Sequence, residues 1–302
     1  MKLGAKIGGS FGLVVLVLLL LGGLAIFSLA TIKKSCTIIG NDLIPLSGYT
    51  GDSSVTTWKF RWQMLGYYLT NQQNYIDDGK KIQANVESIL DSMSKHVANH
   101  KDTLGSYTDE VAKAQTSLKN YRILIDKMEV ETKKLDDLLK DEKAAMASVN
   151  DTLDSYFNEM DEIVGKQVDS KSSDVAKANI KKTKDANDGL NYINDARIAN
   201  VYAMFNYETE KFKIASAKLQ KATEVFDAVL KDTEKESLRD KLKSVLSSIK
   251  TYKADIDTYN ETNDEKNATY AEMKKSGGAL LESIEKLDSG AAETVVAGSK
   301  GS

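Results

Sequence analysis

Two short stretches of the chain combine an arginine with several aromatic side chains. The first is WKFRWQMLGYY, in which Arg61 stands between Trp58 and Trp62, the two tryptophans of the sequence. The second surrounds Arg197, which lies 136 residues further on and has Tyr202 among its aromatic neighbours. Only four arginines occur in the chain, and lysine supplies the other positive side chains. The geometry of the guanidinium group is therefore a candidate reason why arginine, and not lysine, stands at positions 61 and 197.

A planar guanidinium donates two parallel hydrogen bonds to a carboxylate, which an ammonium group cannot reproduce. No Asp or Glu lies within one helical turn of Arg61, so an external anion is one interpretation. We expect the two arginines to face one pocket near Thr132 and Asn263, where a dicarboxylate would satisfy both. The structural alternative is that the arginine stems cover aromatic residues at a helix junction, with their charges in water.

The elements that position these residues follow an internal repeat. SLKNYRILID, from Ser117, resembles SIKTYKADID, from Ser248, at an offset of 131 residues. Apolar residues at alternating spacings of three and four predict two long helices, 107–166 and 236–295, each on the order of 90 Å. Thr132 and Asn263 interrupt the apolar pattern at matching places. They are either tolerated polar core positions or the point where each long helix changes partners.

Two shorter helices precede each long helix. The first pair is predicted from the membrane segment to about Leu69 and from about Asp78 to Asn99, and the second pair at 172–207 and 212–230. A long helix that spans two levels can pack against a different short pair at each level. The sequence therefore predicts an all-helical protein in which six helices form two stacked four-helix bundles.

The first 32 residues predict a membrane segment. The chain carries no charged side chain from Ile7 to Ile32, which is long enough for a helix to cross a hydrocarbon core of ~30 Å. A cleaved signal peptide is the alternative, because Lys2 and Lys6 form a basic start. We expect an uncleaved anchor with the N-terminus inside, an extracytoplasmic helical domain with a ligand-binding pocket at 33–295, and a linker or tail at 296–302.

Composition excludes several functions. The 41 basic and 44 acidic side chains are mixed along the chain, which argues against nucleic-acid binding. One cysteine, Cys36, cannot form a disulfide within the chain, although it could crosslink two subunits. The sequence contains no nucleophile elbow, phosphate-binding glycine loop or zinc-hydrolase helix. We therefore expect neither an enzyme nor a bound cofactor.

Two further pairs of residues are candidate sites. Tyr121 and Tyr252 are matched by the repeat, and a small acid could lie between them in the distal bundle, although core packing explains them as well. His96 and His100 have the spacing of two metal ligands on one helix face. With no identifiable third ligand and a helix end expected to be exposed, metal binding is the less favoured interpretation.

The hydrophobic opening and the repeated order of arginine stretch, short helix and long helix resemble a methyl-accepting chemotaxis protein, a bacterial chemoreceptor. Residues 35–290 resemble its helical bimodular sensor domain. The resemblance implies a homodimer in the bacterial inner membrane with a periplasmic sensor that binds small organic acids. It also implies a further membrane helix, a HAMP linker and a cytoplasmic part that acts on a histidine kinase through a coupling protein.

The sequence departs from that family after each arginine. Members typically carry an acidic-basic-acidic triplet that begins at the third residue after the arginine. Here that place is taken by Met64, Leu65 and Gly66 after Arg61, and by Asn200, Val201 and Tyr202 after Arg197. The ligand preference of the family is therefore not carried over. Two other functions remain open: a membrane-tethered helical stalk or adaptor without a ligand, and the input domain of a sensor histidine kinase.

Overall fold

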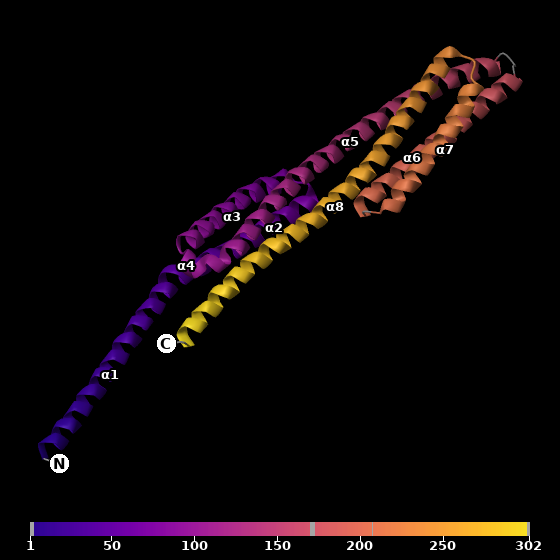
Figure 1. Cartoon of the computed structure of the whole chain (residues 1–302). Helices are drawn as coiled ribbons and strands as arrows, with labels where there is room; N and C mark the ends of the chain where they lie inside the picture. The colour runs from indigo at the N-terminus through magenta and orange to yellow at the C-terminus, as the bar shows by residue number, and fades with distance from the viewer. Residues whose placement is uncertain (1–2, 170–172, 207, 301–302) are drawn as a thin grey trace. The chain divides into compact units, whose positions relative to one another are not determined.

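The computed structural model describes residues 3–169, 173–206 and 208–300 (Figure 1). Within these residues every regular element is a helix, which confirms the all-helical prediction. The two long helices are α5 (Thr108–Asp169) and α8 (Glu236–Lys300). Both were predicted, and each continues a few residues further toward its C-terminal end than the apolar pattern indicated.

The N-terminal part is one continuous helical rod. Helix α1 (Leu3–Ile38) leads through a single π-helical turn, η1 (Ile39–Leu43), into α2 (Ile44–Thr70). Among the described helices, this N-terminal rod alone contains a segment long and apolar enough to cross a membrane. Pro45 lies in the first turn of α2, where a helix tolerates a residue without an N–H.

The connection from α2 to α3 (Gln73–Asn99) is shorter than predicted. The polar stretch from Thr70 to Asn74 was expected to be a loop and α3 to start near Asp78, but only Asn71 and Gln72 lie outside the helices. Asn71 adopts the left-handed conformation, with φ of 56°, and its N–H donates to the Tyr67 carbonyl over 2.8 Å. This helix-terminating geometry reverses the chain within two residues, so the rest of the polar stretch is helical instead of forming a longer loop.

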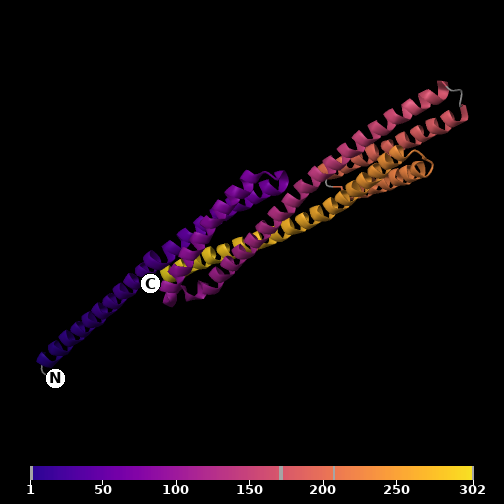
Figure 2. The same ribbon diagram turned by 90° about the horizontal axis from the view of Figure 1, so that it is seen from above.

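The remaining short helices complete the repeat. A short turn, α4 (Lys101–Leu104) and η2 (Gly105–Tyr107), connects α3 to α5. Helices α6 (Ser173–Asn206) and α7 (Thr209–Lys231) lie side by side as a hairpin in both views (Figures 1 and 2). Arg239 closes the end of α7, because its guanidinium donates to the carbonyls of Leu230 and Thr233 over 3.1 and 2.9 Å.

The chain divides into two compact units. Unit 1 comprises residues 1–126 and 270–302, and unit 2 comprises residues 127–269. The divisions of α5 and α8 fall within about two helical turns of Thr132 and Asn263. This supports the prediction that each long helix changes partners near those two polar residues.

The core of unit 1 receives side chains from four helical segments. Phe60 of α2 and Tyr121 of α5 pack with ring centroids 4.7 Å apart, and Tyr68 of α2 stacks on Tyr270 of α8 at 3.9 Å. Further fully buried apolar residues come from α2, α3, α5 and α8: Met64, Ile76, Val86, Leu90, Met93, Ala114, Met273, Leu280 and Leu287. Of these residues, Ala114, Met273, Leu280 and Leu287 fall at the apolar spacing that predicted the two long helices.

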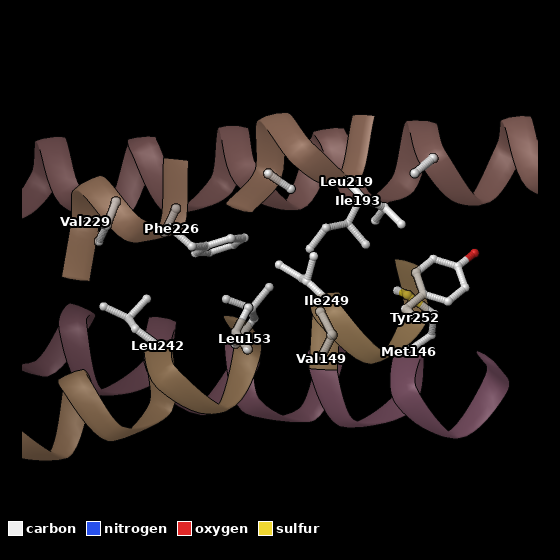
Figure 3. Close-up of a cluster of buried hydrophobic side chains, with 14 of the residues drawn as sticks. Met146, Val149, Leu153, Ile193, Leu219, Phe226, Val229, Leu242, Ile249 and Tyr252 are labelled. Carbon is white, nitrogen blue, oxygen red and sulfur yellow. The ribbon is translucent and has the colours of Figure 1, made fainter. Parts of the chain in front are cut away.

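Unit 2 has its own hydrophobic core, also built from four helical segments (Figure 3). Phe226 of α7 is fully buried and lies against Gly189 of α6. A Cβ atom at position 189 would be only 2.7 Å from the Phe226 ring, so glycine makes this close approach of α6 and α7 possible. In the figure, the labelled core residues of α5 and α8 lie opposite helices α6 and α7: Met146, Val149, Leu153, Leu242, Ile249 and Tyr252.

Candidate functional site in unit 2

A pocket of about 350 Å³ lies among α5, α6 and α8 of unit 2. Arg197 and Tyr252, two of the sequence-predicted site residues, line it. Leu139 falls at the apolar spacing of the long helix, lines the pocket as well, and is 38% exposed. The rest of the lining combines polar and apolar side chains: Glu142, Lys143, Met146, Ala147, Asn150, Asn200, Val201 and Met204.

Glu142 is a buried carboxyl group in the wall of this pocket. It is only 6% exposed, and its Oε2 accepts a hydrogen bond of 2.8 Å from Nδ2 of Asn200. Its Oε1 atom is buried without a hydrogen-bond partner among the described residues. Burial raises the pKa of Glu142 to about 7; the charge of Asp255 adds to this rise and the bond from Asn200 opposes it.

Asn200 and Tyr252 continue this polar group. Nδ2 of Asn200 also lies 3.5 Å from the Tyr252 hydroxyl, while its Oδ1 is buried with no partner in the part of the chain that the structure describes. Burial, and then the nearby Glu142, raises the pKa of Tyr252 to about 12, so its hydroxyl stays protonated. Figure 3 shows Tyr252 beside Met146 at one end of the apolar cluster, with its hydroxyl oxygen pointing away from the cluster.

Arg197 and Lys143 add positive charge to the pocket. Both side chains are exposed to solvent. No described residue forms a hydrogen bond or an ion pair with the Arg197 guanidinium. Its charge does act on Tyr252, whose pKa it lowers slightly against the stronger effect of burial. The guanidinium is thus available to an anion that enters from solvent.

Replacing Glu142 by glutamine should stabilise the fold above neutral pH. The folded chain holds the Glu142 proton up to about pH 7, whereas an unfolded chain releases it near the ordinary 4.5. The native carboxyl therefore lowers the free energy of unfolding progressively as pH rises between these values, and the full penalty remains above them. We expect Glu142→Gln to gain on the order of 2 kcal/mol at pH 8 and almost nothing at pH 4.

Urea unfolding followed by circular dichroism at the two pH values measures this effect. Glu265→Gln, an exposed glutamate of α8 in the same unit, is the matched control and should change little at either pH. An equal gain for Glu142→Gln at both pH values would mean that removal of the charge is not its cause.

Arg61 belongs to unit 1 and has a different environment. It is half-buried, and its guanidinium carbon lies 4.8 Å from the ring centroid of Trp58, a cation–π contact. Its side chain also packs over Gly277 beside Tyr121, and burial raises the pKa of that tyrosine. Trp58 and Trp62 are themselves exposed, at 57% and 70%. Whether Arg61 and Arg197 act on one ligand stays a prediction.

The other predicted site residues do not line the pocket. Thr132 is buried and Asn263 half-buried, so the residue that fills the matching core position on α8 is its neighbour Thr262. Tyr202 is 52% exposed and lies under the ammonium of Lys211. Tyr121 lies in unit 1 and Tyr252 in unit 2. Placing both tyrosines in one distal bundle was therefore wrong; the repeat puts equivalent residues in different units.

A polar cluster lies near Thr132 in unit 2. Glu131 is 5% exposed and accepts a hydrogen bond of 2.9 Å from Thr269, and burial raises its pKa. Lys266 is equally buried, and burial lowers its pKa to about 8 despite the attraction of Asp136 and Glu131. Thr132 itself takes no part in this pairing, because its Oγ1 is buried with no hydrogen-bond partner among the described residues.

The two histidines both contact Asp42, a partner that sequence spacing did not reveal. The π-helical turn η1 directs Asp42 inward, where it pairs with Nδ1 of His100 at 2.7 Å and accepts a hydrogen bond from Thr103. His96 Nε2 lies 2.8 Å from the Asp42 backbone oxygen. Both histidines are half-buried, which corrects the expected exposed helix end. No group of three metal-ligating side chains occurs among the described residues.

Glu142 and Asn200 are the site residues that sequence reasoning missed. Glu142 stands between Leu139 and Met146 at a core spacing of α5, and Asn200 continues a core spacing of α6. A carboxylate or an amide at such a position is the signal that could have identified them, because buried polar groups need partners.

Comparison with known proteins adds no family to this description. Neither the protein-family models nor the curated proteins contain a match to the chain.

Proposed function

We propose that the chain is the ligand-sensing region of a transmembrane chemoreceptor that binds small organic acids. The observation that carries this proposal is the pocket in unit 2, in which Arg197 offers a guanidinium that no described residue pairs. A carboxylate is the ligand group that best matches a planar guanidinium. Lys143 adds a second positive charge to the same wall.

The dimensions and lining of the pocket suit a small organic molecule. Its volume of about 350 Å³ falls at the lower end of the range for small-molecule sites, on the order of 300 to 1,000 Å³. A few polar groups are set among apolar side chains of Leu139, Met146 and Met204. This supports an acid with a short carbon skeleton rather than a polymer or an extended cofactor.

Transmission of a signal would use the long helices. The pocket is lined by both α5 and α8, which extend through unit 1 as well as unit 2. We infer that the two units are four-helix modules, arranged end to end, and that ligand favours one of two packings of the long helices. A small axial or rotational shift would then pass through the membrane to a cytoplasmic kinase-control part. The ligand must bind the two packings unequally to have this effect.

An exposed apolar stripe on α2 supports assembly into a homodimer. The stripe continues from α1 at alternating spacings of three and four, a pattern typical of a helix seam. A second copy anchored in the same bilayer would present the same stripe in parallel, which favours self-association. The stripe consists of Ile44, Gly48, Gly51, Val55, Trp58, Trp62, Leu65 and Leu69, all exposed except the half-buried Leu65.

Trp62→Glu should weaken this dimer without unfolding the chain, because position 62 is 70% exposed. Oxidative crosslinking at the exposed Cys36 reports the association, and we expect the yield of crosslinked dimer to fall severalfold. Lys59→Glu, an exposed off-stripe change on the same helix, is the control and should leave the yield close to that of the native chain. Equal yields for the two variants would contradict the assignment of the stripe.

A thermal-unfolding screen tests the ligand-sensing function. Full-length chain in detergent is melted with acids of two to six carbons, including succinate and acetate, at large excess. A ligand at a hundred times its Kd should stabilise the folded state by about 2.7 kcal/mol, which raises Tm by several degrees. A helical stalk or adaptor would show no shift with any acid, and that result would refute the proposal.

The cellular setting is part of the same proposal. Helix α1 would anchor the chain in the bacterial inner membrane, with the two units in the periplasm. A chemotaxis histidine kinase and its coupling protein would be the cytoplasmic partners, reached through a part that follows the sensor. A sensor histidine kinase with the same input region would bind the same ligands, so the screen does not separate these two outputs.

A further inference from the structure

The pocket in unit 2 carries groups of opposite character, and the inference drawn from them rests on the proposed ligand-binding function. Arg197 and Lys143 supply positive charge from exposed positions. Once Glu142 is ionised, its Oε1 and the Oδ1 of Asn200 are two buried acceptor atoms that have no hydrogen-bond partner among the described residues. A ligand with only carboxylate groups would satisfy the cations and leave both acceptors unpaired.

We infer that this pocket takes a small zwitterion, an α-amino acid, whose carboxylate binds Arg197 and whose ammonium group donates to Glu142 and Asn200. An ammonium group has three donors and no acceptor, which matches two unpaired oxygens. Oε1 of Glu142 and Oδ1 of Asn200 are nearly inaccessible in the structure. Their side chains must therefore turn slightly toward the ligand when it enters.

A second acidic group at this place would be unfavourable. Glu142 is already held away from water, and a ligand carboxylate beside its ionised form would place two like charges together. The other charged or titratable groups near Glu142 come from all three helices. They are Asp141 and Lys143 of α5, Arg197 of α6, and Tyr252 and Asp255 of α8.

The apolar part of the lining indicates the side chain of the amino acid. Leu139, Met146, Ala147, Val201 and Met204 contribute the apolar surface. Together with a volume of about 350 Å³, these residues favour a short aliphatic side chain over a charged one. Valine is therefore a suitable probe.

Isothermal titration calorimetry on the full chain with three matched probes tests the inference. L-valine carries both charged groups, 3-methylbutanoate lacks the ammonium group, and isobutylamine lacks the carboxylate. A charge-assisted hydrogen bond contributes enough to make valine bind roughly tenfold to a hundredfold more tightly than either partial probe. Equal or tighter binding of 3-methylbutanoate would overturn the inference and leave the proposed binding of organic acids intact.

Failure of every probe, with succinate and acetate also inactive, would overturn the inference and the proposed function together. Glu142→Gln gives a second readout, because it keeps the size of the side chain and removes the charge. We expect this variant to lose the preference for valine and to bind 3-methylbutanoate about as well as the native chain does. An unchanged preference for valine in Glu142→Gln would refute the role of the carboxylate.

The pH dependence of binding tests whether the ammonium group contacts an ionised carboxylate. Glu142 becomes ionised as pH rises through about 7, so valine binding should strengthen between pH 6 and pH 8. Binding of 3-methylbutanoate should weaken or stay constant over the same interval. Parallel behaviour of the two probes would contradict the contact between the ammonium group and Glu142.

Discussion

Arg197→Ala should weaken binding of carboxylate ligands on the order of a hundredfold. Two parallel charge-assisted hydrogen bonds are lost, and each contributes about 1.5 kcal/mol or more. The fold should tolerate the change, because the side chain is exposed and no described residue bonds to the guanidinium. Calorimetric titration with the best acid or amino acid from the screen measures the loss.

Two variants make this result specific. Arg197→Lys keeps the charge but not the fork, so we expect it to retain part of the affinity. Arg122→Ala removes another exposed arginine, located in unit 1, and should leave binding unchanged. Full affinity in Arg197→Ala would refute the carboxylate pocket as assigned.

Arg61→Ala separates a single-arginine site from the predicted two-arginine site. If Arg197 alone binds the carboxylate, Arg61→Ala should leave the affinity of this pocket unaltered. A matching hundredfold loss would instead support one dicarboxylate held by both arginines. The cation–π contact of Arg61 with Trp58 predicts a changed tryptophan fluorescence in this variant regardless of binding.

Phe226→Ala should lower the free energy of unfolding by about 3 to 5 kcal/mol, the usual cost of truncating a buried phenylalanine. The ring is fully buried in the core of unit 2, and Gly189 opposite it has no side chain that could move into the space. Urea unfolding followed by circular dichroism gives the value.

Phe205→Ala is the matched control for this truncation. The same side chain at position 205 is 81% exposed, so its removal should cost less than about 0.5 kcal/mol. If Phe226→Ala lowers the free energy of unfolding as little as Phe205→Ala does, the packing of α6 on α7 does not depend on Phe226. A loss confined to Phe226→Ala supports the core shown in Figure 3.

The long helices could be predicted because their apolar residues recur with an unbroken helical period over many turns. Residues such as Leu118, Ile125, Leu242 and Ile249 are buried as that period requires. The predicted start of α3 was wrong because one residue, Asn71, reverses the chain through a left-handed backbone conformation. Local polarity does not reveal how few residues a turn needs.

The candidate site was predicted only in part. Arg197 and Tyr252 line one pocket, although they were predicted to belong to two different sites. The polar residues beside them, Glu142 and Asn200, were not recognised because they occupy positions of the apolar pattern. The repeat also led to a misplacement, since Tyr121 and Tyr252 are equivalent by sequence yet belong to different units. Sequence periodicity shows which face is buried, whereas the meeting of three helices at one pocket is a property of the tertiary structure.

The inward position of Asp42 bears on how α1 can turn about its own axis. The segment from Phe11 to Ala30 is apolar on all sides, so a bilayer would impose no preferred azimuth on it. The contacts of Asp42 with His100 and Thr103 therefore fix the rotation of α1 about its axis relative to the turn that connects α3 to α5. Torque applied to α1 would therefore be resisted first at the wider helical turn that carries Asp42.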